Sequence, residues 1–396
     1  MPKHPTRVAI GLLLLVHLLA ACFTDFAESI PSHVSPDTVH VSVNDSWDLR
    51  REDAELVAIW TDSTATHLEF GKIGGIDLVG NDQVVILDRM AAEARVITFD
   101  GDLVATVGRQ GQGPGEISGA LTLAVLVLPG GEVTMPDAQN ARIVRYSVDG
   151  DYVGSIPWDI AASAVQEWRL SSFDTLAVRA VTTSQEFFIR RDLEGVHQDT
   201  LLVVPRLIQG PSDEEPRWPL MPDRWAWDER GGDLVVGKMG SPGITLVRNG
   251  QSVKTLVWEV GRRTPSREDV EHLLRIAADA QGQSGDIPAG LRARMAPPSE
   301  LHAFADIRIL PGGNVMVQRL REIADMDRRV LSTMGARGSG GRTWDVFSWK
   351  GEHLGLLDFS HNVQVFALRG HWILGVLEGP GAVPYGFIAK VPSWAL

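Results

Sequence analysis

The sequence predicts an all-β fold, a six-bladed β-propeller with a helical insertion, behind an N-terminal lipoprotein signal peptide. Three observations support this prediction. Short runs rich in β-branched and aromatic residues alternate with turns of Gly, Asp and Asn over most of the 396 residues. A unit containing four such runs recurs along the chain. The first residues combine a positive start, a short apolar run and a cysteine.

The repeat is clearest in two units, residues 76–108 and 124–157. Asp88 matches Asp137 and Gly101 matches Gly150, in both cases 49 residues further on. Each unit contains four short strands joined by turns. A unit of about 40–50 residues with four strands is typical of a propeller blade.

Four weaker units follow, and they complete the predicted ring. They cover residues 174–195, 223–260, 307–359 and 363–391. The last unit supplies only three strands, and we expect the run Leu56 to Trp60 from the N-terminal side to complete it. Such a closure joins the two ends of the ring. The propeller is therefore expected to span residues 51–396.

Two insertions interrupt the pattern. In residues 262–300, Thr264 and Pro265 predict a helix cap followed by proline at the first helical position. Acidic Glu268 and Asp269 suit the first turn, and apolar residues then follow helical spacing: Val270, Leu273, Leu274 and Ala277. Residues 324–342 are charged and then rich in glycine, which predicts a mobile loop.

The N-terminus predicts secretion. A positive start with Lys3 and Arg7 precedes the apolar run Ile10 to Leu19, which is too short for a comfortable membrane span. Leu19-Ala20-Ala21-Cys22 follows, and this cysteine is the only one in the chain. The alternative to a lipoprotein is an ordinary signal peptide with a chance cysteine.

The segment that ends at Cys22 resembles the lipobox of bacterial lipoproteins. The resemblance implies that residues 1–21 are removed as a signal peptide and that Cys22 receives the lipid. Residues 22–50 would then be a lipidated tether. The protein would be anchored to a membrane of the cell envelope. Phe23 favours the outer membrane, facing the periplasm or the cell surface.

The charge of the chain excludes one class of partner. The formal net charge is −13 at pH 7, and removal of residues 1–21 with Lys3 and Arg7 brings it to −15. A field of that sign repels the phosphate backbone of nucleic acids. No nucleic-acid partner is therefore expected.

Residues 108–116, G-R-Q-G-Q-G-P-G-E, invite comparison with a phosphate-binding loop. They connect two predicted strands, whereas dinucleotide and P-loop motifs connect a strand to a helix. The glycine spacing fails, because Glu116 stands where G-x-G-x-x-G needs its third glycine. The stretch is therefore predicted to be a crossing between two blades.

This stretch, following F-D-G-D-L-V-A-T-V, resembles bacterial six-bladed β-propeller lipoproteins, which are related to the NHL-repeat group. In the second unit, the segment from Asp137 through Asn140 and Arg142 to Ile143 is similar to the D-x-x-N-x-R-I core of an NHL repeat. The first unit departs from this core, because no Asn lies between its Asp and Arg. The resemblance implies the fold over most of residues 55–396 and implies no activity.

The repeated polar residues are expected to be structural. We expect them to hold blade turns through hydrogen bonds to the backbone, and the less favoured alternative is a role as acids facing the channel. These residues are Asp88, Asp137, Asn140 and Arg142.

Tryptophans provide the candidate ligand-binding residues. Trp218, Trp225 and Trp227 lie close together in the sequence of the fourth unit. Exposed indole rings would suit a sugar or peptide ligand. Packing between blades is the alternative, which the general tendency of tryptophan to be buried favours.

A metal site is the other candidate chemistry. His302, His361 and His371 fall near the inner ends of the late units and form the only plausible histidine cluster. No H-E-x-x-H, paired-cysteine or G-x-S-x-G motif occurs. The D-G-D sequences at 100–102 and 149–151 are predicted to be hairpin turns rather than calcium loops.

The sequence therefore favours a protein without catalytic residues or a cofactor: a lipid-anchored binding module for a protein, peptide or glycan. The alternative is a metal-dependent, lactonase-like propeller hydrolase or lyase with Ca²⁺ or Zn²⁺ in the central channel. A third hypothesis is a structural envelope component with no specific ligand.

Overall fold

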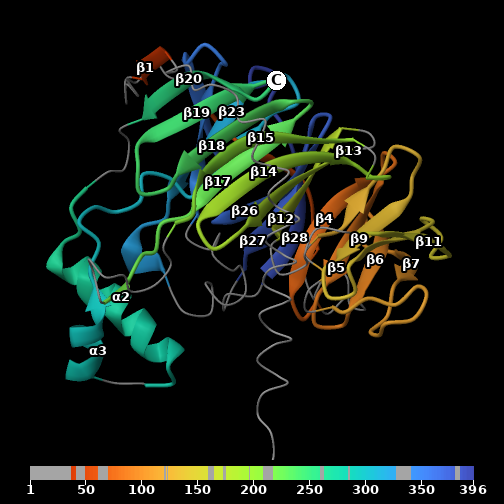
Figure 1. The fold of residues 1–396 in the computed structure, drawn as a ribbon, viewed down its shortest axis with the longest axis horizontal. Helices are drawn as coiled ribbons and strands as arrows, with labels where there is room; N and C mark the ends of the chain where they lie inside the picture. The colour runs from red at the N-terminus through yellow and green to blue at the C-terminus, as the bar shows by residue number, and fades with distance from the viewer. Residues whose placement is uncertain are drawn as a thin grey trace, which may run out of the picture. The chain divides into compact units, whose positions relative to one another are not determined.

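Six sheets, each built on four antiparallel strands, follow one another along the chain and surround a common axis (Figure 1). The computed structural model describes residues 37–41, 50–60, 70–119, 122, 124–158, 165–172, 175–195, 197–207, 217–258, 263–283, 286–326, 340–379 and 384–396. The arrangement confirms the prediction of a six-bladed propeller.

Blades 1 to 3 have four strands each. Blade 1 comprises β4 (Ile73–Val79), β5 (Gln83–Asp88), β6 (Glu93–Thr98) and β7 (Leu103–Val107). Blade 2 comprises β8 (Leu126–Val127), β9 (Val133–Asp137), β10 (Arg142–Tyr146) and β11 (Tyr152–Pro157). Blade 3 comprises β12 (Val165–Ser172), β13 (Thr175–Val181), β14 (Gln185–Asp192) and β15 (Gln198–Pro205).

Blades 4 to 6 contain strands from both ends of the chain. Blade 4 comprises β17 (Trp225–Arg230), β18 (Asp233–Lys238), β19 (Gly243–Arg248) and β20 (Gln251–Trp258). Blade 5 comprises β22 (Asp306–Ile309), β23 (Val315–Leu320), β24 (Gly340–Phe347) and β25 (His353–Asp358). Blade 6 comprises β26 (Val363–Arg369), β27 (Trp372–Glu378), β28 (Pro384–Lys390) and β3 (Glu55–Trp60).

The N-terminal segment closes the ring and extends two blades. Strand β3 pairs antiparallel with β28, with Trp60 opposite Gly386, which confirms the predicted closure. Strand β1 (Asp37–Val41) adds a fifth, parallel strand to β20 of blade 4. Strand β2 (Arg51–Asp53) adds a parallel strand to β25 of blade 5. Strand β1 lies in the predicted tether, residues 22–50, and β2 lies at the start of the predicted propeller, where no strand was expected before Leu56.

The core consists of apolar layers between neighbouring blades. In β5, Val84 and Ile86 belong to the cluster shared with blade 6. The intervening Val85 and Leu87 belong to the cluster shared with blade 2. Side chains of a strand alternate between the two faces of its sheet, so a strand that is buried on both faces reads as a continuous apolar run. This explains the unbroken V-V-I-L sequence of this strand.

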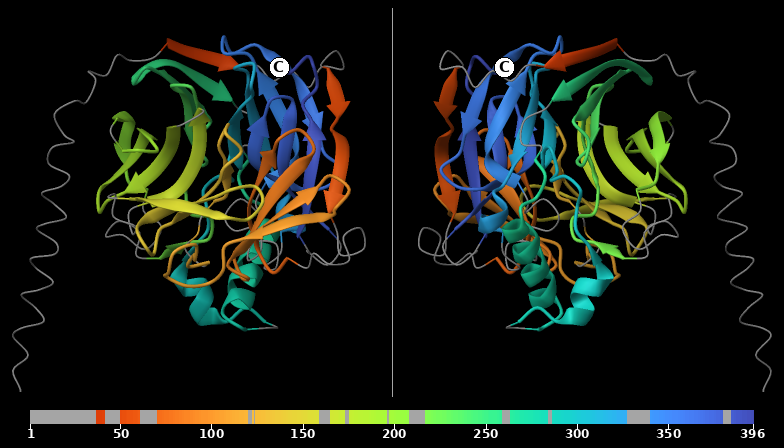
Figure 2. Two further views of the ribbon diagram at one scale, coloured as in Figure 1. Left: turned by 90° about the vertical axis from the view of Figure 1, so that its right-hand side faces the viewer. Right: turned by 90° about the vertical axis from the view of Figure 1, so that its left-hand side faces the viewer.

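The insertion after blade 4 contains α2 (Arg267–Ala280) and α3 (Ala289–Arg294) and projects from the face of the ring opposite the C-terminus (Figure 2). The cap of α2 is Ser266 rather than Thr264. Its hydroxyl accepts from the N–H of Asp269, whose carboxylate accepts from the N–H of Ser266, at 3.1 and 2.7 Å. This reciprocal capping box fixes the first turn two residues after the predicted start. The short strands β16 (Trp218–Pro219) and β21 (Met295–Ala296) join the base of the insertion.

Several predictions concern residues outside the described ranges. These are the signal peptide of residues 1–21, the lipidated Cys22 and most of the tether. The predicted loop 324–342 is described only at its ends, which belong to η2 (Ile323–Asp325) and β24. Within the described part of the chain, no helix is long and apolar enough to cross a membrane.

Closure of the ring yields a stability prediction. Trp60 is 3% exposed, and its indole N–H donates to the carbonyl of Phe99 at 3.2 Å. Trp60→Ala should lower the free energy of unfolding by about 3–5 kcal/mol, because it empties a site between blades 1 and 6. Val57→Ala, on the same strand but 40% exposed, should change it by less than about 1 kcal/mol. Equal effects in urea unfolding would show that this pairing does not hold the ring closed.

Candidate functional site: the central channel

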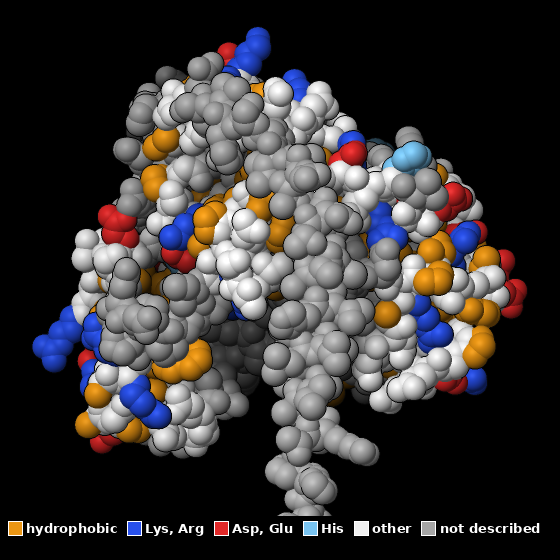
Figure 3. Space-filling model, in the orientation of Figure 1, with side chains coloured by type: hydrophobic (Ala, Val, Ile, Leu, Met, Phe, Trp, Pro, Cys, Tyr) orange, Lys and Arg blue, Asp and Glu red, His pale blue; other side chains and the backbone are white. Residues whose placement is uncertain are grey.

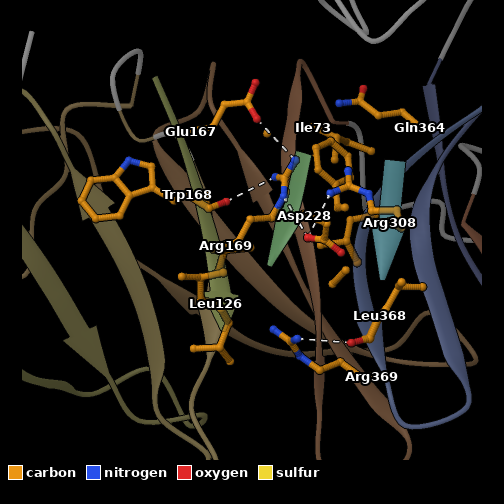
Figure 4. A pocket seen from close by; sticks show the side chains of 18 of the residues that line it. Ile73, Leu126, Glu167, Trp168, Arg169, Asp228, Arg308, Gln364, Leu368 and Arg369 are labelled. Carbon is orange, nitrogen blue, oxygen red and sulfur yellow. Dashed lines mark hydrogen bonds and ion pairs between the residues drawn. The ribbon is translucent and has the colours of Figure 1, made fainter. Parts of the chain in front are cut away.

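The first strand of every blade lines a cavity on the axis of the ring (Figure 4). The cavity has a volume of about 260 Å³. Its walls include parts of β4, β8, β12, β17, β22 and β26. Because the ring is closed, residues that lie nearly 300 positions apart in the sequence face one another here.

The wall of this cavity is rich in cations. Six basic and three acidic residues contribute to it: Lys72, Arg89, Arg169, Arg230, Arg308 and Arg369, with Glu167, Asp228 and Glu229. Burial raises the pKa of Glu229, which favours the neutral form of that carboxyl. The channel is therefore positively charged in a chain whose net charge is −13.

Arg169, Arg308 and Asp228 meet in the middle of the channel. One carboxylate oxygen of Asp228 lies 3.5 Å from the Arg169 guanidinium and 3.8 Å from that of Arg308. The other oxygen accepts from the backbone N–H of Ile309 at 2.9 Å. Arg308 also pairs with Asp306 at 2.8 Å. These charges join blades 3, 4 and 5, and a structural role accounts for them.

The channel end formed by the last residues of β4 and β26 carries a second neutralised pair. Arg369 lies 2.7 Å from Asp77, whose carboxylate also accepts from the backbone N–H groups of Leu78 and Val127. The latter bond crosses from blade 1 to blade 2. A fixed carboxylate thus satisfies this arginine.

Arg230 lies at the same end and differs in its partners. Its guanidinium donates to two backbone carbonyls, of Ile309 at 3.3 Å and of Leu368 at 3.0 Å. No carboxylate forms an ion pair with it in the described part of the chain. Burial lowers the pKa of this guanidinium, although Asp228 nearby opposes the shift. Arg230 is thus a desolvated cation, which an anion in the cavity would stabilise.

Lys72 and Arg89 lie at the opposite end of the channel. The carboxylate of Asp88 fixes this segment by accepting from four backbone N–H groups, of Gly71, Lys72, Met90 and Ala91, at 2.8–3.3 Å. The side chain of Arg89 runs closely over Gly74: a Cβ there would lie 2.4 Å from its Cγ. Within the described residues, the Lys72 ammonium has no hydrogen-bond partner. Asp88 therefore holds in place the strand start that presents this lysine.

Glu167 is the most firmly positioned acid of the wall. The indole N–H of Trp227 donates to it at 2.7 Å, and the guanidinium groups of Arg179 and Arg169 lie 3.3 and 3.4 Å away. The Arg169 guanidinium stacks 5.2 Å from the centre of the Trp227 ring. Trp227 therefore orients charged groups of the channel.

The three predicted ligand-binding tryptophans do not share a surface. Trp227 is 1% exposed, Trp225 is half-buried beside the cluster between blades 3 and 4, and Trp218 is 54% exposed at the base of the insertion. Trp225 and Trp227 therefore belong to the packing between blades 3 and 4, the alternative stated above, and only Trp218 of the three is largely exposed. Trp225 and Trp227 are two residues apart in β17 and therefore point to the same face of the sheet. Their different exposure reflects their positions along the strand, because Trp225 begins it and Trp227 lies inside it.

Arg142 holds the glycine-rich stretch 108–116. Its guanidinium donates to the carbonyls of Gly113 and Glu116, both at 2.9 Å. The Glu116 carboxylate in turn accepts from the N–H of Gly113 at 2.8 Å. The stretch connects β7 to β8, so it is a crossing between blades, as predicted.

Asn140 and Asp137 complete this clasp. The Asn140 amide donates to the Asp137 carboxylate at 2.6 Å and to the Gly111 carbonyl at 3.4 Å. Asp137 also lies 3.9 Å from the guanidinium of Arg142. The D-x-x-N-x-R residues thus hold the loop that enters their own blade.

His302, His361 and His371 do not lie together. His361 precedes β26 and His371 follows it, so a seven-residue strand of roughly 20 Å separates them. His302 is buried elsewhere, 3.7 Å from Asp223. Among the described residues, no group of three or more His, Cys, Asp or Glu side chains is placed to hold a metal ion. The expected cluster of His302, His361 and His371 is therefore corrected.

The channel cations could not be recognised from the sequence. They are spread from residue 72 to residue 369, and no local motif connects them. The first strands of blades 3 to 6 each carry an arginine: Arg169, Arg230, Arg308 and Arg369. Arg169 precedes the predicted third unit, residues 174–195, so this recurrence becomes visible only when the blades are known.

Burial of His302 predicts a pH dependence of stability. Desolvation lowers its pKa below the ordinary 6.5, so the folded protein binds this proton less readily than the unfolded chain. The free energy of unfolding should be highest above about pH 6.5 and fall as the pH decreases below that value. When urea unfolding is measured between about pH 7 and about pH 5, the free energy of unfolding of His302→Gln should vary less with pH than that of the unmodified protein. The exposed His361→Gln serves as control, and an unchanged dependence in His302→Gln would contradict the assignment.

Comparison with known proteins agrees with the fold. Residues 62–206, which include blades 1 to 3, match the family DUF5128, described as 6-bladed beta-propeller. No curated protein matches the sequence.

Similar solved structures include a protein from Bacteroides fragilis NCTC 9343, at 12% identity over 90% of this chain and 99% of that chain, with a TM-score of 0.47. A member of the duf4221 family from Bacteroides vulgatus is 8% identical over 85% of this chain and 94% of its own, with a TM-score of 0.45. Virginiamycin B lyase from Staphylococcus aureus is 10% identical over 83% of this chain and 98% of its own, with a TM-score of 0.40. The strand order of the six sheets and the family match over the first three blades give one conclusion: the chain is a six-bladed β-propeller.

Proposed function

We propose that this protein is a binding protein whose central channel holds the anionic group of a ligand. The observation that carries the proposal is the set of six basic side chains in the wall of the cavity, of which Lys72 and Arg230 have no ion-pair partner in the described part of the chain. An anion placed there would be attracted by cations in a low-dielectric environment, where each interaction is stronger than in water. The net charge of the whole chain is −13, so the gathering of basic side chains in the cavity does not follow from composition.

Two of the cations are available to a ligand. Asp77, Asp228 and Asp306 neutralise Arg369, Arg169 and Arg308. Lys72 and Arg230 face the same cavity without an ion pair in the described part of the chain. A carboxylate or phosphate could accept hydrogen bonds from either group, and such charge-assisted bonds are the strong ones.

The rest of the wall limits the ligand. Apolar side chains, among them Ile73, Leu126, Phe366 and Leu368, line the cavity between the charges. A volume of about 260 Å³ is below the usual range for drug-sized ligands. The cavity therefore suits one small residue with an acidic group and an apolar face. An acidic sugar at the end of a glycan and the C-terminal residue of a peptide share this chemistry.

The expected setting of this function is the cell envelope. We propose that the protein is tethered there by a lipid on Cys22, on the strength of the leader sequence that ends at this residue. Mass spectrometry of the N-terminal peptide from detergent-extracted protein should show a lipid-modified Cys22, and Cys22→Ser should release the protein from the membrane fraction. An unmodified cysteine would leave an ordinary secreted protein.

Titration calorimetry with small anions tests the binding site. Glucuronate, N-acetylalanine and inorganic phosphate are the probes, and glucose is the uncharged control. At least one anion should bind, and added salt should weaken it. Because Lys72 and Arg230 lie at opposite ends of the channel, one of Lys72→Gln and Arg230→Gln should raise the Kd about tenfold, by removing a hydrogen bond to a charged group. The other should change the Kd much less. The relative affinities of the three anions distinguish the sources of the acidic group.

The matched control is Lys350→Gln, which removes an exposed charge on a hairpin turn of blade 5 and should leave the Kd unchanged. If no anion binds, or if the control weakens binding as much as the channel variants, the channel is not the binding site. Thermal unfolding of each variant checks that a loss of binding is not a loss of fold.

A further inference from the structure

The chain itself shows how an extended segment binds the outer edge of a blade. Strand β1 runs parallel to β20 from Asp37 opposite Lys254 to Val41 opposite Trp258. Strand β2 adds in the same direction to β25. Main-chain hydrogen bonds between added and resident strands supply affinity in this mode of binding. The outer edges of blades 4 and 5 are thus covered by the protein's own N-terminal segment.

A glycine turn of the next blade completes the place where β1 binds. A Cβ on Gly351, in the hairpin between β24 and β25, would lie 2.9 Å from Leu256 of β20 and 3.2 Å from Val39 of β1. The hairpin of blade 5 therefore lies against the added strand and its neighbour together. Lys350 and Glu352 flank the glycine of this turn.

The hairpin of blade 2 likewise lies against the outer strand of the preceding blade, β7, which carries no added strand among the described residues. A Cβ on Gly150, in the hairpin between β10 and β11, would lie 3.2 Å from the carbonyl oxygen of Thr106 and 3.7 Å from Ala105, both in β7. Within the described residues, no strand pairs with the outer edge of β7. The turn of blade 2 thus borders a free edge, as the turn of blade 5 borders the edge that β1 occupies.

Four large apolar side chains are exposed on β7 and on the neighbouring outer strand β11. Leu103 and Val104 of β7 are 52% and 43% exposed, and Tyr152 and Val153 of β11 are 42% and 49% exposed. These four are among the few large exposed hydrophobic side chains of the described chain. The side of the molecule that carries β7 and β11 shows hydrophobic and charged groups close together (Figure 3). Exposed apolar residues that gather at one place mark interaction sites.

The charge of the turn sets the chemistry of the partner. Asp149 and Asp151 flank Gly150, where blade 5 has Lys350 and Glu352 beside Gly351. Both aspartates are exposed, and neither carboxylate has a hydrogen-bond partner among the described residues. A strand added to β7 would pass these two negative charges. Its complement is a segment with basic residues on the side that faces the turn.

We propose that the outer edge of β7 binds an extended, basic and apolar segment of a partner protein as a fifth, parallel strand of blade 1. The apolar residues of that segment would contact Leu103 and Val104, and its basic residues would pair with Asp149 and Asp151. This site is separate from the channel, and it would be unaffected if the channel bound no anion.

Fluorescence anisotropy with a labelled peptide tests the proposal on the whole protein. The probe is a seven-residue peptide of alternating lysine and valine, and the comparison peptide carries glutamate in place of lysine. The lysine peptide should bind and the glutamate peptide should not. Asp149→Asn combined with Asp151→Asn should raise the Kd about fivefold to tenfold, since two exposed ion pairs are lost. Leu103→Lys combined with Val104→Lys should abolish binding.

Two matched controls separate this site from general attraction to an acidic protein. Asp82→Asn with Asp286→Asn removes the same charge elsewhere on the surface, and Val253→Lys alters the outer strand of blade 4. Both should leave the Kd unchanged. The proposal fails if the lysine peptide does not bind or if the controls weaken it equally. The unmodified protein and the variant Leu103→Lys with Val104→Lys should also be compared by sedimentation. If the unmodified protein self-associates and the variant does not, a second copy of this chain occupies the edge and the proposal fails.

Discussion

The antiparallel pairing of β3 with β28 is the constraint on which the rest of the structure depends. It makes the N-terminal segment the outer strand of the last blade, so the first and last blades cannot separate without breaking a sheet. Trp60 ends this strand and packs with Ile76 of blade 1 and Ile388 of blade 6. Closure in turn fixes the distances between the six first strands that line the channel. A chemical site can exist on the axis only because these strands cannot move apart.

Carboxylates of the inner strands form ion pairs with some of the channel cations and leave others without an ion pair. Asp77 and Asp228 each accept a backbone N–H from the following blade as well as an arginine, so they join blades and neutralise cations at once. Arg230 is held by carbonyls instead and retains its charge toward the cavity. The binding proposal rests on this difference. If every arginine of the channel had a carboxylate partner, a role in holding the blades together would account for all of these charges.

The fold could be predicted from the sequence because propeller blades repeat. The 49-residue spacing of Asp88 and Asp137 reflects equivalent places in two blades, and the run before Asp88 is apolar because β5 is buried on both faces. The added strands could not be predicted: β2 is only R-E-D, and its pairing depends on a neighbour 300 residues away. The same holds for the channel, where Lys72 and Arg230 come from different blades. Short sequence patterns do not show which residues of distant blades become neighbours when the ring closes.

The most direct measurement is a crystal structure of the protein grown with selenate, whose selenium is located by anomalous scattering. This tetrahedral oxyanion carries the charge that the channel is proposed to hold, without the bulk of a sugar or peptide. The account predicts a selenium peak in the cavity with its oxygens within hydrogen-bond distance of the Lys72 ammonium or the Arg230 guanidinium. Selenium peaks confined to the outer surface and to contacts between molecules would contradict it, and the cations of the channel would then be purely structural.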